Sequence, residues 1–431
     1  MIRLLYNLLF PLVLLLFLPG YVAKMLRRGN YREKFGQRLG FYDPETRARL
    51  RLGGSTWLHA VSVGEVMIAL KLAARMKEQE PALRAALTTT TTTGFALAQK
   101  QAPDWIEVLY TPLDFWPIMR RAFAVIQPTR IVLVEAEVWP NLTAIARRRK
   151  ILLALVNARL SPRSERRFRK FNFFVRPYFR NLDLIAVREP EDVARWQSLG
   201  ALPARIHPVG SIKYDPENVV SEPDAPRAAL LTFGIDPDRP ILLAGSTHPG
   251  EEEILGRIYL ELRREFHDLF LVIAPRHVER APEISARLHA LGLQAMRRSE
   301  SGPRSATADC LLLDTTGELR DWYSIATIVF IGKSLTVGGG QNPVEAIVAG
   351  RPVIFGPQMQ NFAALAQSLV VAGGALQADD PPALTNMLRD LLRHPPQRER
   401  LVRQAWTVLG QHRGATERTA RLLETLVPCP A

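Results

Sequence analysis

A repeated alternation of short apolar runs with longer helical patterns is the feature that most constrains the fold of this chain. The first series of runs occupies residues 56–62, 85–90, 130–134, 151–157 and 184–187. The second series occupies residues 241–246, 269–274, 311–315, 328–331 and 353–355. Strands of a parallel sheet that is covered by helices on both faces have this continuous apolar character. The sequence therefore predicts an α/β fold with two parallel sheets.

A polar segment between the two series indicates how the chain divides into domains. Residues 214–239 contain four prolines and predict a linker. We therefore expect one Rossmann-like domain over residues 25–213, a second over residues 240–431, and a cleft between them. Ligands of such sheets bind beyond the carboxyl ends of the strands. No sequence repeat accompanies the duplication, which rests on the strand pattern alone.

The first residues form an apolar run, 4–23, that is just long enough to cross a bilayer. Four basic residues follow it directly: Lys24, Arg27, Arg28 and Arg32. A cleaved signal peptide would carry its charge before the run, so we expect an uncleaved membrane-anchor helix over residues 1–24. The positive-inside rule then places the rest of the chain on the cytoplasmic side. Pro11 and the Leu-Pro-Gly sequence at 18–20 would interrupt a helix. They leave a second possibility, a helix that dips into one leaflet without crossing the membrane.

The balance of charges indicates an anionic partner. Lysine and arginine exceed aspartate and glutamate by 14, which suits nucleic acid, an acidic membrane surface or a phosphorylated substrate. Composition does not choose among these three. The two cysteines, Cys310 and Cys429, support neither a disulfide framework nor a thiolate metal site.

Residues 161–180 interleave basic and aromatic side chains. The basic ones are Arg163, Arg166, Arg167, Arg169, Lys170, Arg176 and Arg180. Such a segment suits a membrane interface or single-stranded nucleic acid. The plain alternative is a helix with its aromatic residues in the core and its arginines in water. Because an apolar run begins the chain, we favour an anionic lipid surface and expect no nucleic acid partner.

Carboxylates follow two of the predicted strands in the first series. Glu65 closes the turn after residues 56–62, where it can accept a proton from a hydroxyl or simply complement a helix dipole. Glu135 and Glu137 follow residues 130–134, and strand alternation would place both on one side. Paired carboxylates also suit a metal, but no Asp-x-Asp or histidine cluster joins them, so we predict no metal site.

Small and basic residues follow the strands of the second series. Residues 244–248 read Ala-Gly-Ser-Thr-His and precede an acidic helix, an arrangement that suits phosphate or a plain helix cap. Arg276 follows residues 269–274 and can bind a phosphate through two parallel hydrogen bonds, although most such arginines are merely exposed.

A glycine-rich loop at residues 338–340 leads into a predicted helix. Asn342 suits the N-cap, Pro343 the first helical position, and Glu345 can hold ribose hydroxyls from the first turn. The loop matches neither the Walker pattern nor the dinucleotide fingerprint. It predicts a turn that faces phosphate in a sugar-nucleotide domain.

Ten segments of the chain stand in the order found in the Kdo (3-deoxy-D-manno-oct-2-ulosonic acid) transferases, and the chain resembles that family over nearly its whole length. The segments are WLHAVSVGE, TTTTTTG, VEAEVWPN, VNARLS, VGSIKYD, AGSTHPGEEE, APRHVER, DTTGEL, GGGQNPVEA and GP-x-x-x-NF. The resemblance implies a GT-B fold and a glycosyltransferase of the inner membrane, without a cofactor or metal. It implies that Kdo passes from CMP-Kdo to the lipid A precursor, lipid IVA, with inversion at the anomeric carbon.

The resemblance also implies roles for particular residues. Glu65 would be the base that deprotonates the acceptor hydroxyl, and Glu135 and Lys213 would support the transition state. The residues that would hold CMP are Pro275, Arg276, Thr316, Gly317, Glu318, Asn342, Pro343, Val344 and Glu345. The chain departs from the usual family pattern at Gln37, Lys333 and Gln341, where Glu, Gly and His are usual.

Two rival functions follow from the same features. One is a GT-B transferase that uses another nucleotide sugar, and the segments at 275–277 and 342–345 argue instead for CMP. The other is a catalytically lapsed relative that only binds lipid. Retention of Glu65, Glu135 and Lys213 argues for an active enzyme.

Overall fold

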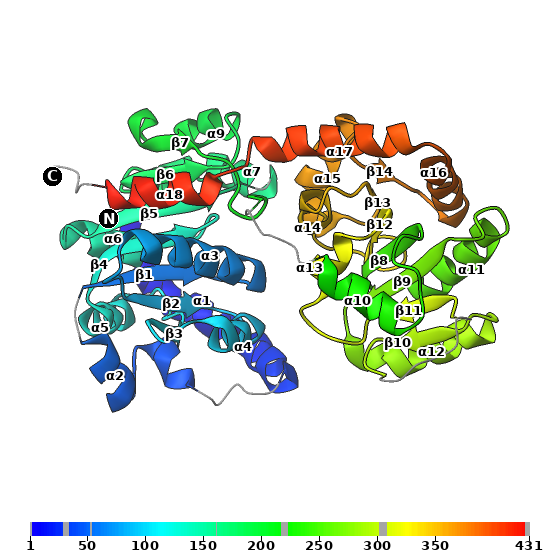
Figure 1. The fold of residues 1–431 in the computed structure, drawn as a ribbon. Helices are drawn as coiled ribbons and strands as arrows, with labels where there is room; N and C mark the ends of the chain where they lie inside the picture. The colour runs from blue at the N-terminus through cyan, green and yellow to red at the C-terminus, as the bar shows by residue number, and fades with distance from the viewer. Residues whose placement is uncertain are drawn as a thin grey trace. The chain divides into compact units, whose positions relative to one another are not determined.

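The computed structural model describes residues 2–28, 34–51, 54–160, 162–216, 223–300 and 308–426. The chain forms two compact units, Met1–Asp215 with Gly414–Ala431 and Pro216–Arg413. Each unit has one seven-stranded parallel sheet with helices packed on it (Figure 1). The predicted α/β fold with two Rossmann-like sheets is confirmed.

The sheet of the first unit has the strand order β3-β2-β1-β4-β5-β6-β7, and all its pairs are parallel. Its strands are β1 (Ser55–Ala60), β2 (Ala85–Thr89), β3 (Ile106–Tyr110), β4 (Pro128–Val134), β5 (Leu152–Ala158), β6 (Leu184–Val187) and β7 (Ile206–Pro208). The chain leaves β1 toward β2 and returns to the other side of β1 as β4. The carboxyl ends of β1 and β4 thus form the switch point where such folds bind ligands.

Helices cover both faces of this sheet. They are α1 (Ile2–Arg28), η1 (Phe35–Leu39), α2 (Pro44–Leu50), α3 (Val63–Gln79), α4 (Thr92–Gln101), α5 (Trp116–Ile126), α6 (Pro140–Arg148), α7 (Pro162–Lys170), α8 (Asn172–Phe179), α9 (Asp192–Ser198), η2 (Pro203–Arg205) and α18 (Ala415–Glu424). Because side chains alternate along a strand, Trp57 and Leu58 of β1 join separate core clusters on opposite faces. Both residues are fully buried.

The C-terminal helix α18 belongs to the first unit, which corrects the predicted extent of the second domain, 240–431. Leu423 of α18 is buried in the same core cluster as Leu72 of α3. The buried Asp215 fixes the place where the chain returns, because its carboxylate accepts the N–H groups of Gly414 and Thr416, each at 2.8 Å. Apolar periodicity shows that α18 is amphipathic, but not which core receives it.

The sheet of the second unit has the strand order β10-β11-β9-β8-β12-β13-β14, again with parallel pairs throughout. Its strands are β8 (Ile241–Thr247), β9 (Phe270–Pro275), β10 (Ala295–Arg297), β11 (Cys310–Leu312), β12 (Ile328–Ile331), β13 (Val353–Phe355) and β14 (Leu376–Gln377). Its helices are α10 (Asp224–Thr232), α11 (Glu251–Arg263), η3 (Val278–Arg280), α12 (Ala281–Ala290), α13 (Leu319–Tyr323), α14 (Val344–Val348), η4 (Gln360–Phe362), α15 (Ala363–Val371), α16 (Pro381–Arg393) and α17 (Pro395–Gly410). The switch point here lies between β8 and β12.

Part of the predicted linker, 214–239, is instead helix α10 of the second unit. Leu230 of α10 is fully buried, and Phe233 and Ile235 after it are buried as well. The prolines misled the prediction, because Pro226 lies in the first turn of the helix, where a missing N–H breaks no hydrogen bond.

Helix α1 packs against the first unit through one of its faces. The side-chain oxygen of Asn7 accepts the N–H of Trp116 at 3.0 Å, and the Phe10 ring stacks on Phe115 with centroids 5.5 Å apart. The opposite side of α1 exposes a row of leucines, which we call the leucine face: Leu4, Leu5, Leu8, Leu9, Leu12, Leu15 and Leu16.

The predicted spanning anchor over residues 1–24 finds no support among the residues that the structure describes. None of their helices combines the length and hydropathy that crossing a bilayer requires.

Candidate active site

Glu65 lies in the first turn of α3, directly beyond the carboxyl end of β1. Its Oε1 accepts the hydroxyl of Ser62 and its Oε2 accepts the N–H of Val61, both at 2.8 Å. Each carboxylate oxygen has a second lone pair that these bonds leave available. Burial raises the pKa of Glu65, and the nearby carboxylate of Glu135 raises it further. The group is thus a stronger base than an exposed glutamate.

Glu135 follows the last residue of β4 with a left-handed backbone, φ +64°. This conformation is uncommon for a residue with a side chain and recurs at functional sites. It is held by the Glu135 N–H, which donates to the carbonyl of Val156 on the neighbouring strand at 3.0 Å. Because β4 ends at Val134, the strand alternation expected for Glu135 and Glu137 does not apply here.

Glu137 belongs to the same acidic cluster, although the sequence assigned no role to this residue. Burial raises its pKa to about 7, and the carboxylates of Glu65 and Glu135 contribute to that shift. The carboxylate of Glu137 therefore lies near those of Glu65 and Glu135. The signal in the sequence was the second acid of the E-x-E-x-W-P segment.

Lys213 lies on the loop after β7 and faces Glu135. Burial lowers the pKa of Lys213, while the negative charge of Glu135 acts in the opposite direction. The loop is fixed by Asn157 at the end of β5, whose side-chain oxygen accepts the N–H of Ile212 at 3.1 Å and the hydroxyl of Ser211 at 3.2 Å. Asn157 also has a positive φ, +50°, which Asn tolerates better than most residues.

One further residue near Lys213, Arg188, was missed from the sequence. Arg188 follows β6, is buried, and places its guanidinium 5.9 Å from the ring centroid of Tyr214. Its positive charge helps to lower the pKa of Lys213. Only its position directly after a short strand could have marked it.

The first unit therefore brings together the three residues predicted to be catalytic, although they are far apart in sequence. Glu65 comes from the end of β1, Glu135 from the end of β4, and Lys213 from the loop after β7. Parallel strands place these ends at one edge of the sheet. The site combines a buried base with a cation that can stabilise developing negative charge.

In the second unit, the buried carboxylate of Glu251 organises the switch point. It accepts four backbone N–H groups, from His248 at 2.9 Å, Lys333 at 2.7 Å, Ser334 at 2.9 Å and Leu335 at 3.0 Å. The first of these follows β8 and the other three follow β12. Glu251 thus ties the loops at the carboxyl ends of the two strands.

The glycine-rich loop after β12 packs too tightly to accept side chains at two positions. A Cβ on Gly332 would lie 2.5 Å from the carbonyl oxygen of Ser246. Gly340 has φ +69° and donates its N–H to the carbonyl of Lys333 at 2.7 Å. Close packing and this hydrogen bond therefore hold the backbone of the loop in a single conformation.

The helix predicted to begin at Pro343 begins one residue later, and its N-cap is not Asn342. Helix α14 starts at Val344, and Pro343 occupies the cap position. Asn342 accepts the N–H of Val344 at 3.2 Å, which forms a local turn instead of a cap. Glu345 lies in the first turn as predicted.

The remaining residues predicted to hold CMP also lie beyond strands of the second sheet. Pro275 ends β9, and the exposed Arg276 follows it, with its N–H donating to the carbonyl of Thr247 at 3.0 Å. Thr316 and Gly317 are exposed between β11 and α13. Glu318 is already engaged, since its carboxylate accepts a hydrogen bond from Arg298 at 3.2 Å.

Gln37, one of the departures from the family pattern, is buried in the first unit. Its side-chain oxygen accepts the N–H of Tyr110 at 2.9 Å. A glutamine therefore supplies the acceptor that a glutamate would supply at this position. Across the described stretches of the chain, no three carboxylate, imidazole or thiolate groups are arranged to hold a metal.

Solved structures similar to this chain identify its fold class. MurG from Acinetobacter baumannii matches with a TM-score of 0.53 at 16% identity, over 86% of this chain and 99% of that one. The UDP-GlcNAc 2-epimerase of Neisseria meningitidis matches with a TM-score of 0.56 at 12% identity, over 86% and 99%. At these identities the likeness concerns the fold, which is of the GT-B type. The twin parallel sheets and these neighbours place the chain in the class of GT-B folds.

Sequence comparison gives the family. Residues 33–216 match the family model described as 3-deoxy-D-manno-octulosonic-acid transferase (kdotransferase). The chain is 33% identical to the 3-deoxy-D-manno-octulosonic acid transferase of Haemophilus influenzae over 92% of both chains. It is 35% identical to that of Bordetella pertussis over 88% of this chain and 89% of the relative. This chain belongs to the 3-deoxy-D-manno-octulosonic acid (Kdo) transferase family.

Proposed function

We propose that this enzyme transfers Kdo from CMP-Kdo to the lipid A precursor lipid IVA, with inversion at the anomeric carbon and without a metal. The observation that carries the proposal is the buried Glu65, with its raised pKa, beside Glu135 at the switch point of the first sheet. An inverting displacement needs one base, and Glu65 has the position and basicity for that role.

In the proposed reaction, the acceptor hydroxyl oxygen forms a bond to the anomeric carbon of Kdo. The bond from that carbon to the CMP phosphate breaks, and the phosphate oxygen keeps the electron pair. The proton of the hydroxyl passes to the carboxylate of Glu65. Attack on the face opposite the departing phosphate inverts the anomeric centre.

Lys213 and Glu135 would support the transition state. The ammonium group of Lys213 offers positive charge to the Kdo carboxylate or the departing phosphate, in a partly buried setting where such charges act strongly. Glu135 opposes the effect of burial on the pKa of Lys213 and so helps to keep that lysine protonated. No metal is needed to supply this charge.

The donor nucleotide would lie at the carboxyl edge of the second sheet. Arg276 is exposed there and can bind the phosphate of CMP with charge-assisted hydrogen bonds. Thr316, Gly317 and Glu318 would contact the nucleotide from the neighbouring loop. Asn342, Pro343, Val344 and Glu345 would hold the ribose and base from the start of α14.

We propose further that the enzyme works on the cytoplasmic side of the inner membrane, with α1 lying in one leaflet. Its leucine face is exposed, and Leu4 and Leu16 each retain 76% of their surface. Exposed aromatic and basic residues of α7 and α8 would add to this surface, among them Phe173 at 70% exposure, Arg167 and Lys170. Such a mixture suits an anionic membrane interface.

The test is transfer by the purified enzyme, followed by mass analysis of the lipid product. With CMP-Kdo and the tetraacylated precursor, the lipid should gain the mass of one or more Kdo residues. The gain should persist in EDTA. A product formed only from a different nucleotide sugar would refute the proposed donor, and a complete loss in EDTA that added metal restores would refute metal independence.

A further inference from the structure

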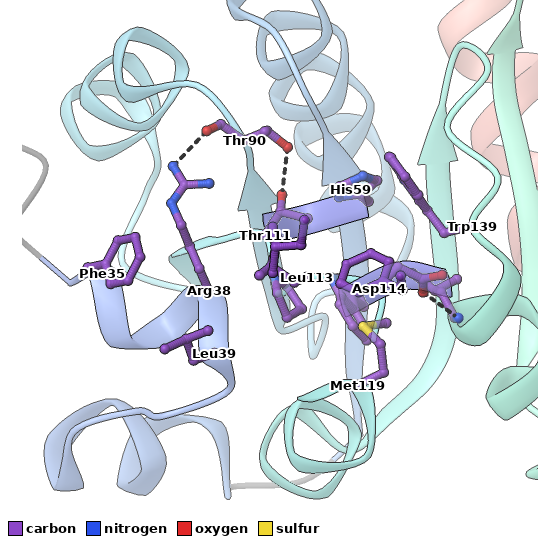
Figure 2. A pocket seen from close by; sticks show the side chains of 15 residues that line it. Phe35, Arg38, Leu39, His59, Thr90, Thr111, Leu113, Asp114, Met119 and Trp139 are labelled. Carbon is purple, nitrogen blue, oxygen red and sulfur yellow. Dashed lines mark hydrogen bonds between the residues drawn. The ribbon is translucent and has the colours of Figure 1, made fainter. Parts of the chain in front are cut away.

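A cavity of about 310 Å³ lies in the first unit, between α1 and the carboxyl edge of the sheet. Most of its lining is apolar, with Phe10 and Leu14 from α1 and Leu113 and Met119 from the region around α5 (Figure 2). Small-molecule sites are concave and largely apolar, with a few polar groups that fix the ligand. The polar groups of this lining therefore indicate what the cavity can bind.

One charged side chain in the cavity wall has no carboxylate partner in the described part of the chain. Arg38 of η1 lines the cavity and is 7% exposed, and its guanidinium is positively charged. Its one hydrogen bond among the described residues goes from Nη2 to the carbonyl oxygen of Thr90, at 2.7 Å (Figure 2). Arginine is rarely buried to this degree without an anion beside it, because a buried charge that lacks a counter-ion costs free energy.

The nitrogen atoms of Arg38 that make no hydrogen bond can be reached from the cavity. Elsewhere in the described stretches some polar atoms are fully buried without a partner, such as Nε2 of His59 and Nε of Arg188, and these are closed to a ligand. No nitrogen of Arg38 is in that state, so Nε and Nη1 keep accessible surface. Figure 2 shows one terminal nitrogen of Arg38 at Thr90 and the other turned away from it. A ligand in the cavity can therefore accept hydrogen bonds from Arg38.

Aromatic stacking holds this guanidinium in the cavity wall. It lies 4.3 Å from the ring centroid of Tyr110, and that ring stacks on Phe95 with centroids 4.1 Å apart and an interplanar angle of 10°. Both rings are buried. An aromatic face attracts a cation but leaves the N–H groups at the edge of the guanidinium available to an anion. The charge is thus held in place before a ligand arrives, which lowers the entropic cost of binding.

The carboxylate of Asp114 also lines the cavity, but it does not neutralise Arg38. Asp114 accepts the N–H groups of Asn141 and Leu142, each at 2.9 Å. Burial raises the pKa of Asp114 to about 7, and the charge of Arg38 does not contribute to that shift. Figure 2 shows the two side chains well apart in the lining. The cavity therefore has a cationic side that is separate from its acidic side.

We propose that this cavity binds the lipid acceptor, with an acyl chain in its apolar part and a phosphate group at Arg38. This inference rests on the proposed lipid acceptor. A phosphate accepts charge-assisted hydrogen bonds from Nε and Nη1 and supplies the negative charge that the buried guanidinium lacks. A hydrocarbon chain alone would leave that charge uncompensated, and free phosphate would leave the apolar space empty.

The place of the cavity favours the acceptor over other phosphorylated lipids. Thr90, Thr111 and Trp139 at the cavity follow β2, β3 and β4, so the cavity shares the sheet edge that carries Glu65. Helix α1 forms part of the cavity wall, while its leucine face is exposed. If α1 lies in one leaflet, the cavity is adjacent to the hydrocarbon of the membrane. A lipid can then enter from the membrane and lie at the edge where the proposed base acts.

Binding is tested by calorimetry with octyl phosphate and octyl glucoside, which share one chain, below the concentrations at which they form micelles and with the donor site filled by CMP. Wild-type enzyme should bind octyl phosphate about 10- to 100-fold more tightly, the range expected of hydrogen bonds to a charged group. Equal affinity for the two would overturn the role of Arg38. Inorganic phosphate should bind more weakly than octyl phosphate, and equal binding of these two would overturn the role of the apolar space.

Two substitutions separate the charge of Arg38 from a structural role. Arg38→Gln should lose the preference for octyl phosphate, and Arg38→Lys should keep part of it. Without ligand, Arg38→Gln should resist urea at least as well as the wild type, because it removes a buried charge that lacks a counter-ion. Octyl phosphate should protect the wild type and not this variant. A variant that is less stable without ligand, yet equally protected by octyl phosphate, would show that Arg38 is structural and overturn the proposal.

A matched control for the charge is Arg149→Gln, since the Arg149 guanidinium also lies over an aromatic ring, 5.4 Å from the centroid of Phe123, and Arg149 does not line the cavity. This variant should keep the preference for octyl phosphate. Its loss there would show that net charge, and not the cavity, attracts the ligand.

The apolar part of the cavity is tested with Leu113→Trp, which fills the space and keeps Arg38. This change should weaken binding of both octyl compounds by about tenfold or more, because the chain can no longer be buried. The matched control is Leu231→Trp, at a leucine of the second unit that is 62% exposed. Unchanged affinity for both compounds in Leu113→Trp would overturn the proposed seat.

Turnover separates the acceptor from other lipids. Arg38→Gln should raise the KM for the acylated, phosphorylated acceptor about tenfold, while kcat and the KM for the donor change less than about twofold. The effect should shrink with an acceptor whose phosphates have been removed, and an equal effect on both acceptors would overturn the proposal.

Displacement of bound octyl phosphate identifies the occupant directly. The acceptor should displace it, whereas displacement by phosphatidylglycerol vesicles and not by the acceptor would assign the cavity to a membrane lipid and overturn the proposal. Because the binding measurements need no sugar donor, they stand even if the wild-type enzyme transfers no Kdo, which would refute the proposed function alone.

Discussion

Ser62 and Glu65 bond to each other at the start of α3. The Ser62 hydroxyl donates to Oε1 of Glu65 at 2.8 Å, and the Glu65 N–H donates back to the Ser62 oxygen at 3.4 Å. This exchange belongs to the capping-box type and satisfies groups that a helix start leaves without partners. Glu65 therefore has a structural role as well as the proposed catalytic one, and a variant must separate the two.

Glu65→Gln should lower the turnover rate by a factor of roughly 100 or more, because an amide cannot accept the proton of the acceptor hydroxyl. Its oxygen can still accept the N–H of Val61, so the helix start should persist. CMP affinity, measured by calorimetry, should change less than about twofold. Glu65→Ala is the comparison variant, and it should lose stability as well. Near-normal turnover in Glu65→Gln would exclude Glu65 as the base.

Glu137→Gln should stabilise the enzyme in a pH-dependent manner. The pKa of Glu137 is raised to about 7 in the folded chain from an ordinary value of 4.5, so the folded state binds this proton more tightly than the unfolded state. Stability from this group is thus present at low pH and lost as pH rises from the ordinary value toward 7. The variant should gain about 1 to 2 kcal/mol at about pH 8, after allowance for solvent screening, and little at about pH 4.

Urea unfolding of Glu137→Gln and the wild-type enzyme at both pH values measures this difference. A gain of the same size at both would show that removal of the charge is not the cause.

Arg276→Ala should weaken CMP binding by roughly 10- to 100-fold, because hydrogen bonds to a charged group contribute about 1.5 to 3 kcal/mol. The rate at saturating donor should change much less. Arg264→Ala is a suitable control, since Arg264 is exposed at the far end of α11, away from the carboxyl edge. Unchanged affinity in calorimetry with Arg276→Ala would remove this residue from the donor site.

Replacing Arg167 and Lys170 with Gln should weaken binding to anionic vesicles by about 30-fold, since each basic residue near such a surface contributes roughly 1 kcal/mol. Cosedimentation measures the change, which should shrink as salt rises. The matched pair, Arg400 and Arg403 on α17, is also exposed and should have little effect. A loss of CMP affinity or of folding in the α7 variant would mean that this segment is structural.

Lys333→Gly should stabilise the fold by about 0.5 to 1 kcal/mol. Lys333 has a left-handed backbone, φ +56°, a conformation that glycine adopts without strain. The free energy gained by relieving that strain is larger than the entropic cost of a more flexible unfolded chain. Lys100→Gly in helix α4 should destabilise instead, because φ is helical there. Chemical denaturation measures both, and a loss of stability in Lys333→Gly would show that the lysine side chain makes a contact worth more than the strain.

Strands that have a neighbouring strand on each side were predictable from the sequence, whereas the strands at the edges of the two sheets were not. The sequence pattern identified β1, β2, β4, β5 and β6 in the first sheet, but not β3 or β7 at its edges. In the second sheet it likewise missed β10 and β14, which are the edge strands there. Central strands are buried on both faces and must be apolar throughout, whereas edge strands pair on one side only and carry a weaker pattern.

The sequence by itself determined the twin parallel sheets, the turn that carries Glu65, and the glycine-rich loop after β12, because local periodicity and turn chemistry record these directly. Tertiary structure alone decided that α18 returns to the first unit, that Glu137 joins Glu65 and Glu135, and that the buried Arg38 lines a largely apolar cavity. These features depend on contacts between segments far apart in the chain. Burial and charge at such contacts arise only when the sheet brings the strand ends together, so no local pattern records them.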